Sequence, residues 1–534
     1  MNRALVRLIV VLAGWAPGLT PLAGQTTPYV PYLDPAYGDL DVLVARGLVR
    51  DVLLGHAPHS RAAFTRFVEE ANRRVTGGVP PLDRRSADAL ERLTERFASD
   101  DLDARLLRPR DANVEMSAAS SPIRDLRSGA DGSIDGDLAP LLQRNQGREL
   151  VDGLTWAAEG AADVDGGLVA GSVRSRMWFD VPRGPAGAGA DVTLVEAYAR
   201  TVIGPLGLDL GRNHVALGFG QDGGPLLSHN ARGLDMVRLA TDRPLRLPGP
   251  LRVLGLWEVS ALVANMGHER DIPGSALTIF RLGGGPSRHV EFGFTYLNHQ
   301  GGDGSPDASL RERLHDIFLF WSDGGVLSIS DKVVGADLRV AVSPLRTELY
   351  VNVLTTDDRG RFSQAAGGLW EDAIWLAGAR ALGLGPDGGY DARVEWRHAG
   401  ARAHTHHQFT SGLTLDRRVI GDALGPNATG VQLSVDRTAP SSIVSVTGAW
   451  ERYSGDDFAW SLIPGGGPWD YDWYLVADNP DEIRKRLTID WTGGLRPETL
   501  ATSVRLGYEH VTRYAYGSGN RSNFIAQLRV GYTW

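Results

Sequence analysis

The feature that most constrains the fold is an alternation of apolar and polar residues that persists for some 400 residues, from about residue 113 onwards. In Val290–Tyr296, the apolar residues alternate with Glu291, Gly293 and Thr295. A period of two is typical of a β-strand that presents different environments to its two faces. The chain is therefore expected to be mainly β and antiparallel.

One segment identifies the kind of sheet. Between Tyr390 and Arg397, a face with four charged residues alternates with an apolar face. The charged residues are Asp391, Arg393, Glu395 and Arg397. Four charges are costly in a packed sandwich core, but they suit the polar lumen of a transmembrane barrel whose outer face contacts lipid. They could line a pore or, as is more usual, form ion pairs between strands. An ordinary sheet with one solvated face is the alternative, and the persistence of the pattern favours the barrel.

The last segment also predicts a barrel strand. One of its faces is formed by Phe524, Ala526, Leu528, Val530, Tyr532 and Trp534. An amphipathic last strand that ends in an aromatic residue resembles the signal read by the barrel assembly machinery of outer membranes, which is therefore an expected partner through Trp534. We expect Tyr532 and Trp534 to lie in the periplasmic aromatic girdle.

The direction of that strand predicts which connections face outward. If it descends to the periplasm, 512–522 is an outer loop, and the turns at 493–497, 439–441, 384–388 and 343–344 are periplasmic. The longer polar stretches 356–371, 400–427 and 454–484 then face the exterior. Short periplasmic turns and long outer loops are typical of outer-membrane barrels. Counting the alternating segments gives about 20 strands.

The N-terminal region has a different organisation. Arg3 and Arg7, followed by the apolar run Leu8–Trp15, predict a signal peptide over residues 1–24. Three apolar stripes with helical spacing then predict a small periplasmic helical bundle within residues 25–110. Ser60 and Ser86 are the expected N-caps of the second and third helices. Residues 111–534 are assigned to the barrel.

Composition narrows the class further. The chain has no cysteine, which excludes disulfides, thiolate metal sites and a lipoprotein anchor. With 55 Lys+Arg against 64 Asp+Glu it is mildly acidic, which argues against a nucleic-acid partner. No later stretch of about 18 apolar residues predicts a transmembrane helix.

Several blocks resemble the capsule assembly protein Wzi family. They run in the family's order through nearly all of the mature chain. The blocks are PYVPYLDPAYGDLDVLVARGLV near the start, GRNHVALGFGQDGGPLLSHNARGLDMVRLATDRPLRLPG at 211–249, RHVEFGFTYLNHQGGDG at 288–304, DLRVAVSPLRTELYVNVLTTDD from Asp337 and HHQFTSGLTLDRRVIGDALGPNA from His406. One departure is the pair Ala216–Leu217, where the family pattern has an aromatic such as Trp.

The resemblance implies a large antiparallel barrel of about 18 strands in the outer membrane, two fewer than the count of alternating segments, with the helical bundle at its inner mouth. It also implies a role in anchoring or organising capsular or other surface polysaccharide at the cell exterior. Expected partners are therefore that polysaccharide and the surrounding lipid and lipopolysaccharide. The family is not known for catalysis, so we expect no catalytic residue, cofactor or metal.

The candidate glycan-binding residues lie in the outer stretch 454–484. They are Trp469, Asp470, Tyr471, Asp472, Trp473 and Tyr474, the densest cluster of aromatic and acidic residues in the chain. Aromatic rings stack on the apolar faces of sugars, and carboxylates accept hydrogen bonds from hydroxyls. Membership of the outer aromatic girdle is the alternative interpretation.

Other motifs are weaker. His404, His406 and His407 crowd one outer loop, but a metal site needs defined ligands that the spacing does not supply. Gly218–Gly223 matches GxGxxG outside any strand–helix context, so its glycines indicate a tight, inward-folded loop and not a nucleotide site.

Two other functions were weighed. The pairs Asp357–Asp358 and His315–Asp316 could suggest a hydrolase, but adjacent residues of a strand point to opposite faces. A channel for small solutes is the main alternative function, which a bundle that closes the inner mouth disfavours.

Overall fold

The computed structural model describes most of the mature chain. The described residues are 26–78, 82–97, 107–120, 124–126, 137–139, 141–185, 187–318, 329–342, 345–356, 373–406, 409–462, 464, 471–476, 479–496 and 499–534. The expected signal peptide, 1–24, lies outside them.

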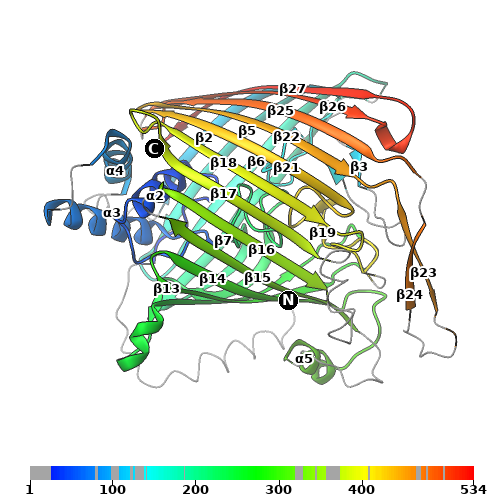
Figure 1. Ribbon diagram of the computed structural model, residues 1–534, viewed down its shortest axis with the longest axis horizontal. Helices are drawn as coiled ribbons and strands as arrows, with labels where there is room; N and C mark the ends of the chain where they lie inside the picture. The colour runs from blue at the N-terminus through cyan, green and yellow to red at the C-terminus, as the bar shows by residue number, and fades with distance from the viewer. Residues whose placement is uncertain are drawn as a thin grey trace.

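The molecule is a closed antiparallel barrel of 18 strands (Figure 1), with β10 and β11 counted as two pieces of one strand because both pair with β12. Each strand pairs with its neighbours along the chain, and β2 pairs with β27 to close the ring. The barrel strands are β2 (Leu107–Ser120), β5 (Gly153–Asp165), β6 (Ala170–Pro182), β7 (Gly189–Ile203), β8 (Leu206–Asn213), β10 (Leu234–Thr241), β11 (Leu245–Arg246), β12 (Leu256–Asn265), β13 (Ala276–Ser287), β14 (Val290–Gln300), β15 (Ser330–Val342), β16 (Thr347–Thr356), β17 (Ile374–Leu384), β18 (Tyr390–Ala399), β21 (Ala428–Ala439), β22 (Ser442–Tyr453), β25 (Glu482–Gly493), β26 (Leu500–Thr512) and β27 (Arg521–Thr533).

The count of about 20 strands was wrong, and the number implied by the resemblance is confirmed. A hairpin of β23 (Asp457–Leu462) and β24 (Tyr471–Val476) lies within the stretch predicted to be an outer loop and forms a two-stranded sheet of its own. A free hairpin and a barrel hairpin share the period of two, so alternation cannot separate them. Three further short pairs are β1 (His56–Ala57) with β9 (Ala216–Leu217), β3 (Arg124–Asp125) with β4 (Asp137–Leu138), and β19 (Thr414–Leu415) with β20 (Arg418–Val419).

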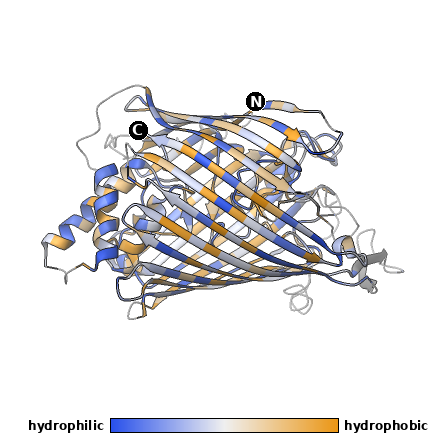
Figure 2. Ribbon diagram, turned by 90° about the horizontal axis from the view of Figure 1, so that it is seen from above, coloured by the Kyte–Doolittle hydropathy of each residue, from blue (hydrophilic) through white to orange (hydrophobic). Residues whose placement is uncertain are grey.

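The two faces of the wall differ as the alternation predicts, and hydrophobic and hydrophilic residues alternate along its strands in Figure 2. Phe294 and Leu433 point outward and are 55% and 54% exposed, whereas Glu395 and Arg397 are each 2% exposed inside. On the last strand, Leu528 is 43% exposed. The outer face is therefore apolar and suited to lipid.

The two ends of the barrel are unequal. At one end the strands are joined by short turns such as 204–205, 288–289 and 440–441. At the other end the connections are long, including 214–233, 301–329 and 400–427. The long-loop end also holds α5 (Leu310–Phe318) and the β23–β24 hairpin, at the right of Figure 1. This confirms the predicted asymmetry.

Three helices cover the short-turn end (Figure 1, left): α2 (Ala36–Ala45), α3 (Arg61–Thr76) and α4 (Arg84–Phe97). Their apolar stripes pack around Leu40, Phe64 and Leu93, each at most 1% exposed. The 3-10 turns η2 (Gly249–Leu254) and η4 (Tyr514–Tyr516) complete the described helices. Among the described residues, no helix is both long and apolar enough to cross a membrane.

One predicted helix cap is confirmed and the other is wrong. The Ser60 hydroxyl accepts a hydrogen bond from the Ala63 amide at 3.2 Å. α4 begins before Ser86, and the Ser86 amide instead donates to the Asp83 carboxylate at 2.9 Å. Asp83 is an equally good capping residue three positions earlier, so the cap preference alone selected the wrong one.

Candidate functional site

A long loop, residues 214–233, turns back from the long-loop end into the barrel. Its β9 pairs with β1 of the N-terminal segment, which enters from the short-turn end. Beyond this pair, the Gly218 amide donates to the Gly55 carbonyl at 2.8 Å. Segments from opposite ends of the barrel therefore meet in its lumen and fill it.

Glycines permit the tight path of this loop, as the sequence predicted. Gly218 and Gly223 have positive φ angles of +90° and +97°, which L residues with a side chain rarely adopt. At Gly224, an added Cβ would lie 1.5 Å from the Leu217 carbonyl oxygen. The GxGxxG motif thus builds a lumenal turn and not a nucleotide-binding loop.

Side chains of the wall hold the loop in place. The Asn352 side chain of β16 accepts from the Phe219 amide at 2.9 Å and donates to the Phe219 carbonyl at 2.7 Å. The Glu395 carboxylate of β18 accepts from the Gln221 amide at 2.7 Å. These contacts satisfy loop backbone groups that would otherwise be buried without partners.

A second loop, 400–427, packs against the first inside the barrel. The Ser228 amide donates to the Ile420 carbonyl at 2.9 Å, and the Asn230 side chain donates to the Val419 carbonyl at 2.9 Å. Apolar side chains of both loops, including Leu226 and Leu413, belong to one buried cluster with the wall. The two loops form a single plug, which we call the loop plug.

The predicted lumenal charges form ion pairs. Arg397 lies 3.1 Å from Asp422 of the loop plug and 3.1 Å from Glu451 of β22. Asp391 lies 3.9 Å from Arg85 of α4. Among the described residues, these charged side chains therefore form ion pairs, which was the alternative to lining a pore.

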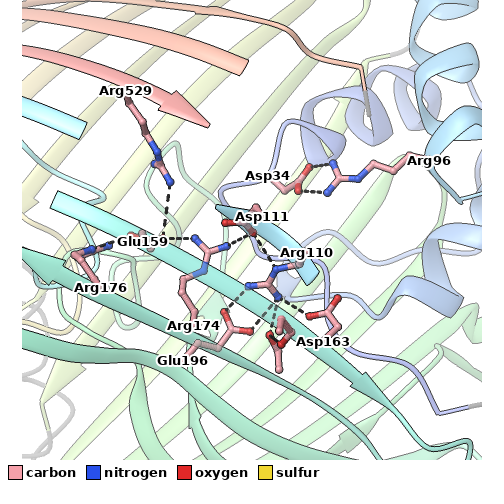
Figure 3. A network of polar contacts seen from close by, with 12 residues as sticks. Asp34, Arg96, Arg110, Asp111, Glu159, Asp163, Arg174, Arg176, Glu196 and Arg529 are labelled. Carbon is pink, nitrogen blue, oxygen red and sulfur yellow. Dashed lines mark hydrogen bonds and ion pairs between the residues drawn. The ribbon is translucent and has the colours of Figure 1, made fainter. Parts of the chain in front are cut away.

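A second lumenal network joins the strands at the other side of the ring (Figure 3). Arg110 of β2 lies 3.1 Å from Asp163 and 3.3 Å from Glu196. Arg174 of β6 contacts Glu159 of β5 at 2.5 Å. Such cross-strand pairs fix the register of neighbouring strands.

The N-terminal segment before α2 is also buried in the barrel, which the sequence did not predict. The Tyr29 hydroxyl donates to the Asp209 carboxylate at 2.9 Å, and its ring lies 4.1 Å beneath the Arg200 guanidinium. The ring of Tyr32 stacks on His229, which stacks on His214. A tyrosine- and proline-rich stretch without periodicity gave no signal for this position.

The histidine-rich loop forms part of the plug. His404 is 3% exposed, and burial lowers its pKa to about 4. The ring of His406 lies 5.8 Å from that of Phe409 and is tilted by 41° to it, and His407 lies outside the described residues. Over the described part of the chain, no three His, Cys, Asp or Glu residues form a group that could hold a metal ion.

Of the two pairs considered for a hydrolase, only His315 and Asp316 lie in the described part of the chain. Asp316 on α5 accepts from Lys332 and from Asn298, each at 2.8 Å. Asp357 and Asp358 lie outside the described residues. Asp316 thus accepts hydrogen bonds from two donors of the barrel wall.

Four of the six candidate glycan-binding residues, 471–474, are on the β23–β24 hairpin at the long-loop end (Figure 1). Trp469 and Asp470 lie outside the described residues, whereas 471–474 open β24. In the backbone register, Tyr471 is opposite Leu462 and Trp473 is opposite Trp460. The hairpin is separate from the barrel ring, in contrast to the strands of an aromatic girdle.

Comparison with known proteins decides the family. The family model of the capsule assembly protein Wzi matches residues 129–441, more than half of the chain. The chain belongs to this family. As a Wzi-family barrel it is an outer-membrane protein, so its short turns face the periplasm and its long loops face the exterior.

One solved structure in particular agrees on the fold. A Wzi from Escherichia coli matches with a TM-score of 0.66 and 16% identity, over 95% of this chain and all of that one. It is described as an outer-membrane protein involved in group 1 capsule assembly and as a carbohydrate-binding β-barrel. OccK7 of Pseudomonas aeruginosa matches with a TM-score of 0.41 and 9% identity, over 80% of this chain and 99% of that one. OccAB1 of Acinetobacter baumannii matches with a TM-score of 0.40 and 8% identity, over 79% and 96%. The search of curated proteins found no match.

Proposed function

We propose that this protein binds surface polysaccharide at the cell exterior and thereby anchors or organises a capsule. Membership of the Wzi family is the observation on which this proposal rests. The filled lumen supports it, because the loop plug and the N-terminal segment occupy the space that a solute would cross. The outer loops then remain as the surface on which a glycan can be bound.

The proposed binding site is the β23–β24 hairpin with Trp469, Asp470, Tyr471, Asp472, Trp473 and Tyr474. Successive residues of a strand belong to opposite faces, so the register assigns Tyr471 and Trp473 to one face and Asp472 and Tyr474 to the other. Each face thus has an aromatic residue that can stack on a sugar ring. The acids can accept hydrogen bonds from hydroxyls.

The test is capsule retention together with direct binding. In a strain that lacks the gene, we expect capsular polysaccharide to be released into the medium, and a capsule that stays fully cell-bound would refute the proposed function. Purified Trp473→Ala protein should bind the released polysaccharide at least tenfold more weakly than wild type. Trp491→Ala is the matched control, because Trp491 is a lipid-facing tryptophan of β25 that is 39% exposed.

A channel for small solutes is the second candidate, and no described feature favours it. The lumenal contact between the Gly218 amide and the Gly55 carbonyl connects loops from both membrane sides. We therefore expect no steady conductance in planar-bilayer recordings. A stable open conductance of the wild-type protein would contradict the assignment. We assign no catalytic residue, cofactor or metal to the protein.

The remaining organisation is also a proposal. Residues 1–24 act as a signal peptide, the helices within 25–110 form a periplasmic bundle, and 111–534 form nearly all of the barrel, whose first strand begins at Leu107. Lipid and lipopolysaccharide contact the apolar wall, and the barrel assembly machinery recognises the last strand. N-terminal sequencing of the mature protein checks the first point, and loss of assembled barrel on deletion of Trp534 checks the last.

A further inference from the structure

A cavity lies at the periplasmic rim, between the end of α2 and the barrel wall. Its volume is about 190 Å³. Residues Val44 to Gly47 form one side, and residues of strands β15 and β16 and of the turns β13–β14 and β15–β16 form the other. Four of the lining residues are arginines, Arg46, Arg288, Arg339 and Arg346, and only one, Glu348, is acidic.

The neighbouring carboxylates do not neutralise all four arginines. Arg46 and Arg346 share one partner, Asp83, with both contacts at 3.1 Å. Arg339 pairs with Glu348, and Glu291 lies 3.8 Å away from it.

Arg288 has no such acidic partner. It makes no ion pair within the described part of the chain, and its Nε donates to the His289 ring at 2.9 Å. The cavity therefore has a positive charge at its lip that the surrounding acids do not balance.

A buried donor also points to a missing acceptor. Arg339 is 4% exposed, and its Nε is buried without a hydrogen-bond partner among the described atoms. Leaving a charged donor unpaired is costly, so such groups in native proteins usually have an explanation. An anionic oxygen in the cavity would be the acceptor that this donor lacks.

The site is shaped by the end of α2. The Leu48 amide donates to the Leu43 carbonyl at 2.9 Å and the Gly47 amide to the Val44 carbonyl at 2.8 Å, which is a Schellman ending. Gly47 has a φ of +71°, and a Cβ there would lie 3.2 Å from Arg288 Nη1. Glycine thus lets the guanidinium approach the helix end closely.

Arg288 also affects a neighbouring cation, Arg50. Burial and the charges of Arg74 and Arg288 lower the pKa of the neighbouring Arg50. An anion held beside Arg288 would lessen the repulsion between these cations.

We propose that this cavity binds an oxyanion, namely a phosphate or carboxylate group presented from the periplasm. Guanidinium groups bind carboxylates and phosphates through paired N–H donors. These paired donors match the oxygens of such anions better than a single point charge does. The volume admits the anionic group together with the start of the molecule that bears it, since a water molecule takes about 30 Å³. The same group could belong to a soluble anion or to the headgroup of an inner-leaflet phospholipid. The site lies on the opposite side of the membrane from the proposed glycan site and does not depend on it.

The test uses the full mature chain in detergent micelles, titrated calorimetrically with inorganic phosphate and with glucuronate. We expect Arg288→Gln to weaken binding about tenfold or more, as for the loss of a charge-assisted hydrogen bond. Glu348→Gln should tighten binding, because it removes the carboxylate that competes for Arg339. A mere loss of folding would not produce opposite effects in the two variants.

Arg496→Gln is the matched control. Arg496 lies at the same rim, 2.9 Å from Glu95 and 3.3 Å from Glu91, and outside the cavity. If soluble anions do not bind, nanodiscs of phosphatidylglycerol should stabilise wild type more than Arg288→Gln, and nanodiscs of phosphatidylcholine should not discriminate; this result assigns the site to a lipid headgroup. The proposal is overturned if no probe separates wild type from Arg288→Gln, or if Arg496→Gln weakens binding equally.

Discussion

Acidification should loosen the loop plug through His404. The imidazole lies beside a small space lined by Leu226, Val333, Leu413 and other apolar residues, and neither ring nitrogen has a hydrogen-bond partner within the described structure. Such surroundings oppose the charged form, which is why burial lowers the pKa of His404 to about 4. The folded plug thus requires a neutral His404.

The direction and size of this pH effect follow from the pKa values of His404 in the open and closed plug. A histidine exposed by opening of the plug has a pKa of about 6.5, so the open form binds a proton first as the pH falls. Closure is therefore unaffected above about pH 7 and weakens progressively between the two pKa values. With a closed-state pKa of about 4, the closed state loses about 2 kcal/mol at pH 5, or roughly 30-fold in the opening equilibrium.

Hydrogen exchange measures that equilibrium. The Leu413 amide donates to the His404 carbonyl at 2.8 Å and the Ser228 amide to the Ile420 carbonyl, so both report opening of the plug. After correction for intrinsic exchange, their protection should fall roughly 30-fold from pH 7.5 to pH 5. Buried His214 and His229, whose pKa values burial also lowers, add to the fall if they open with the loop.

The variant His404→Leu separates these contributions. This variant should lack the part of the pH-dependent loss of protection that is due to His404. Its protection at pH 7.5 should be nearly unchanged. His268→Leu, an exposed histidine of a neighbouring outer loop, should behave as wild type. If His404→Leu retains the full pH dependence of wild type, or if wild type shows none, the reasoning is refuted.

Three substitutions should change stability by different mechanisms. Glu451→Gln leaves Arg397 and Arg486 without their shared buried carboxylate, at 3.1 and 2.7 Å, and should cost about 3–5 kcal/mol in denaturant unfolding of the barrel. Leu433→Arg places a charge in the lipid-facing middle of β21 and should cost about 2–4 kcal/mol when unfolding is measured in lipid vesicles. Ser60→Ala removes the cap of α3 and should cost about 1 kcal/mol, measured by thermal melting of the helical signal.

Matched controls accompany these substitutions. Asp490→Asn breaks a pair with Arg505 that is 28–29% exposed, so it should cost less than about 1 kcal/mol. Val253→Arg lies on η2, 79% exposed and outside the barrel wall, and should be nearly neutral. A control that costs as much as its partner variant would contradict the mechanism assigned to that partner.

The wall of the barrel could be predicted because lipid outside and a polar lumen inside impose one rule on every strand. Tyr390 and Val394 are each 43% exposed, whereas Asp391 and Glu395, which directly follow them, are buried, as the alternation requires. The Gly218–Gly223 turn was also predicted correctly, because its glycines permit backbone angles that other residues avoid. Both predictions depend on local chemistry.

The interior could not be predicted in the same way. The pairing of His56 with Leu217 joins two-residue strands that lie far apart in the chain and have no periodicity. Asp83 and Ser86 are both good caps, and sequence preference did not select the one that begins α4. The glycan-binding residues remain a prediction based on composition.

The meeting of β1 and β9 also limits how this barrel can be assembled. A ring closed by β2 and β27 has no lateral opening, and the paired segments inside it enter from opposite membrane faces. At least one of them must therefore be enclosed before β27 joins β2, or else pass through a mouth of the finished ring. By the first route, a mutation that delays the inward loop would delay closure of the last seam. By the second route, the same mutation would yield a closed but empty ring.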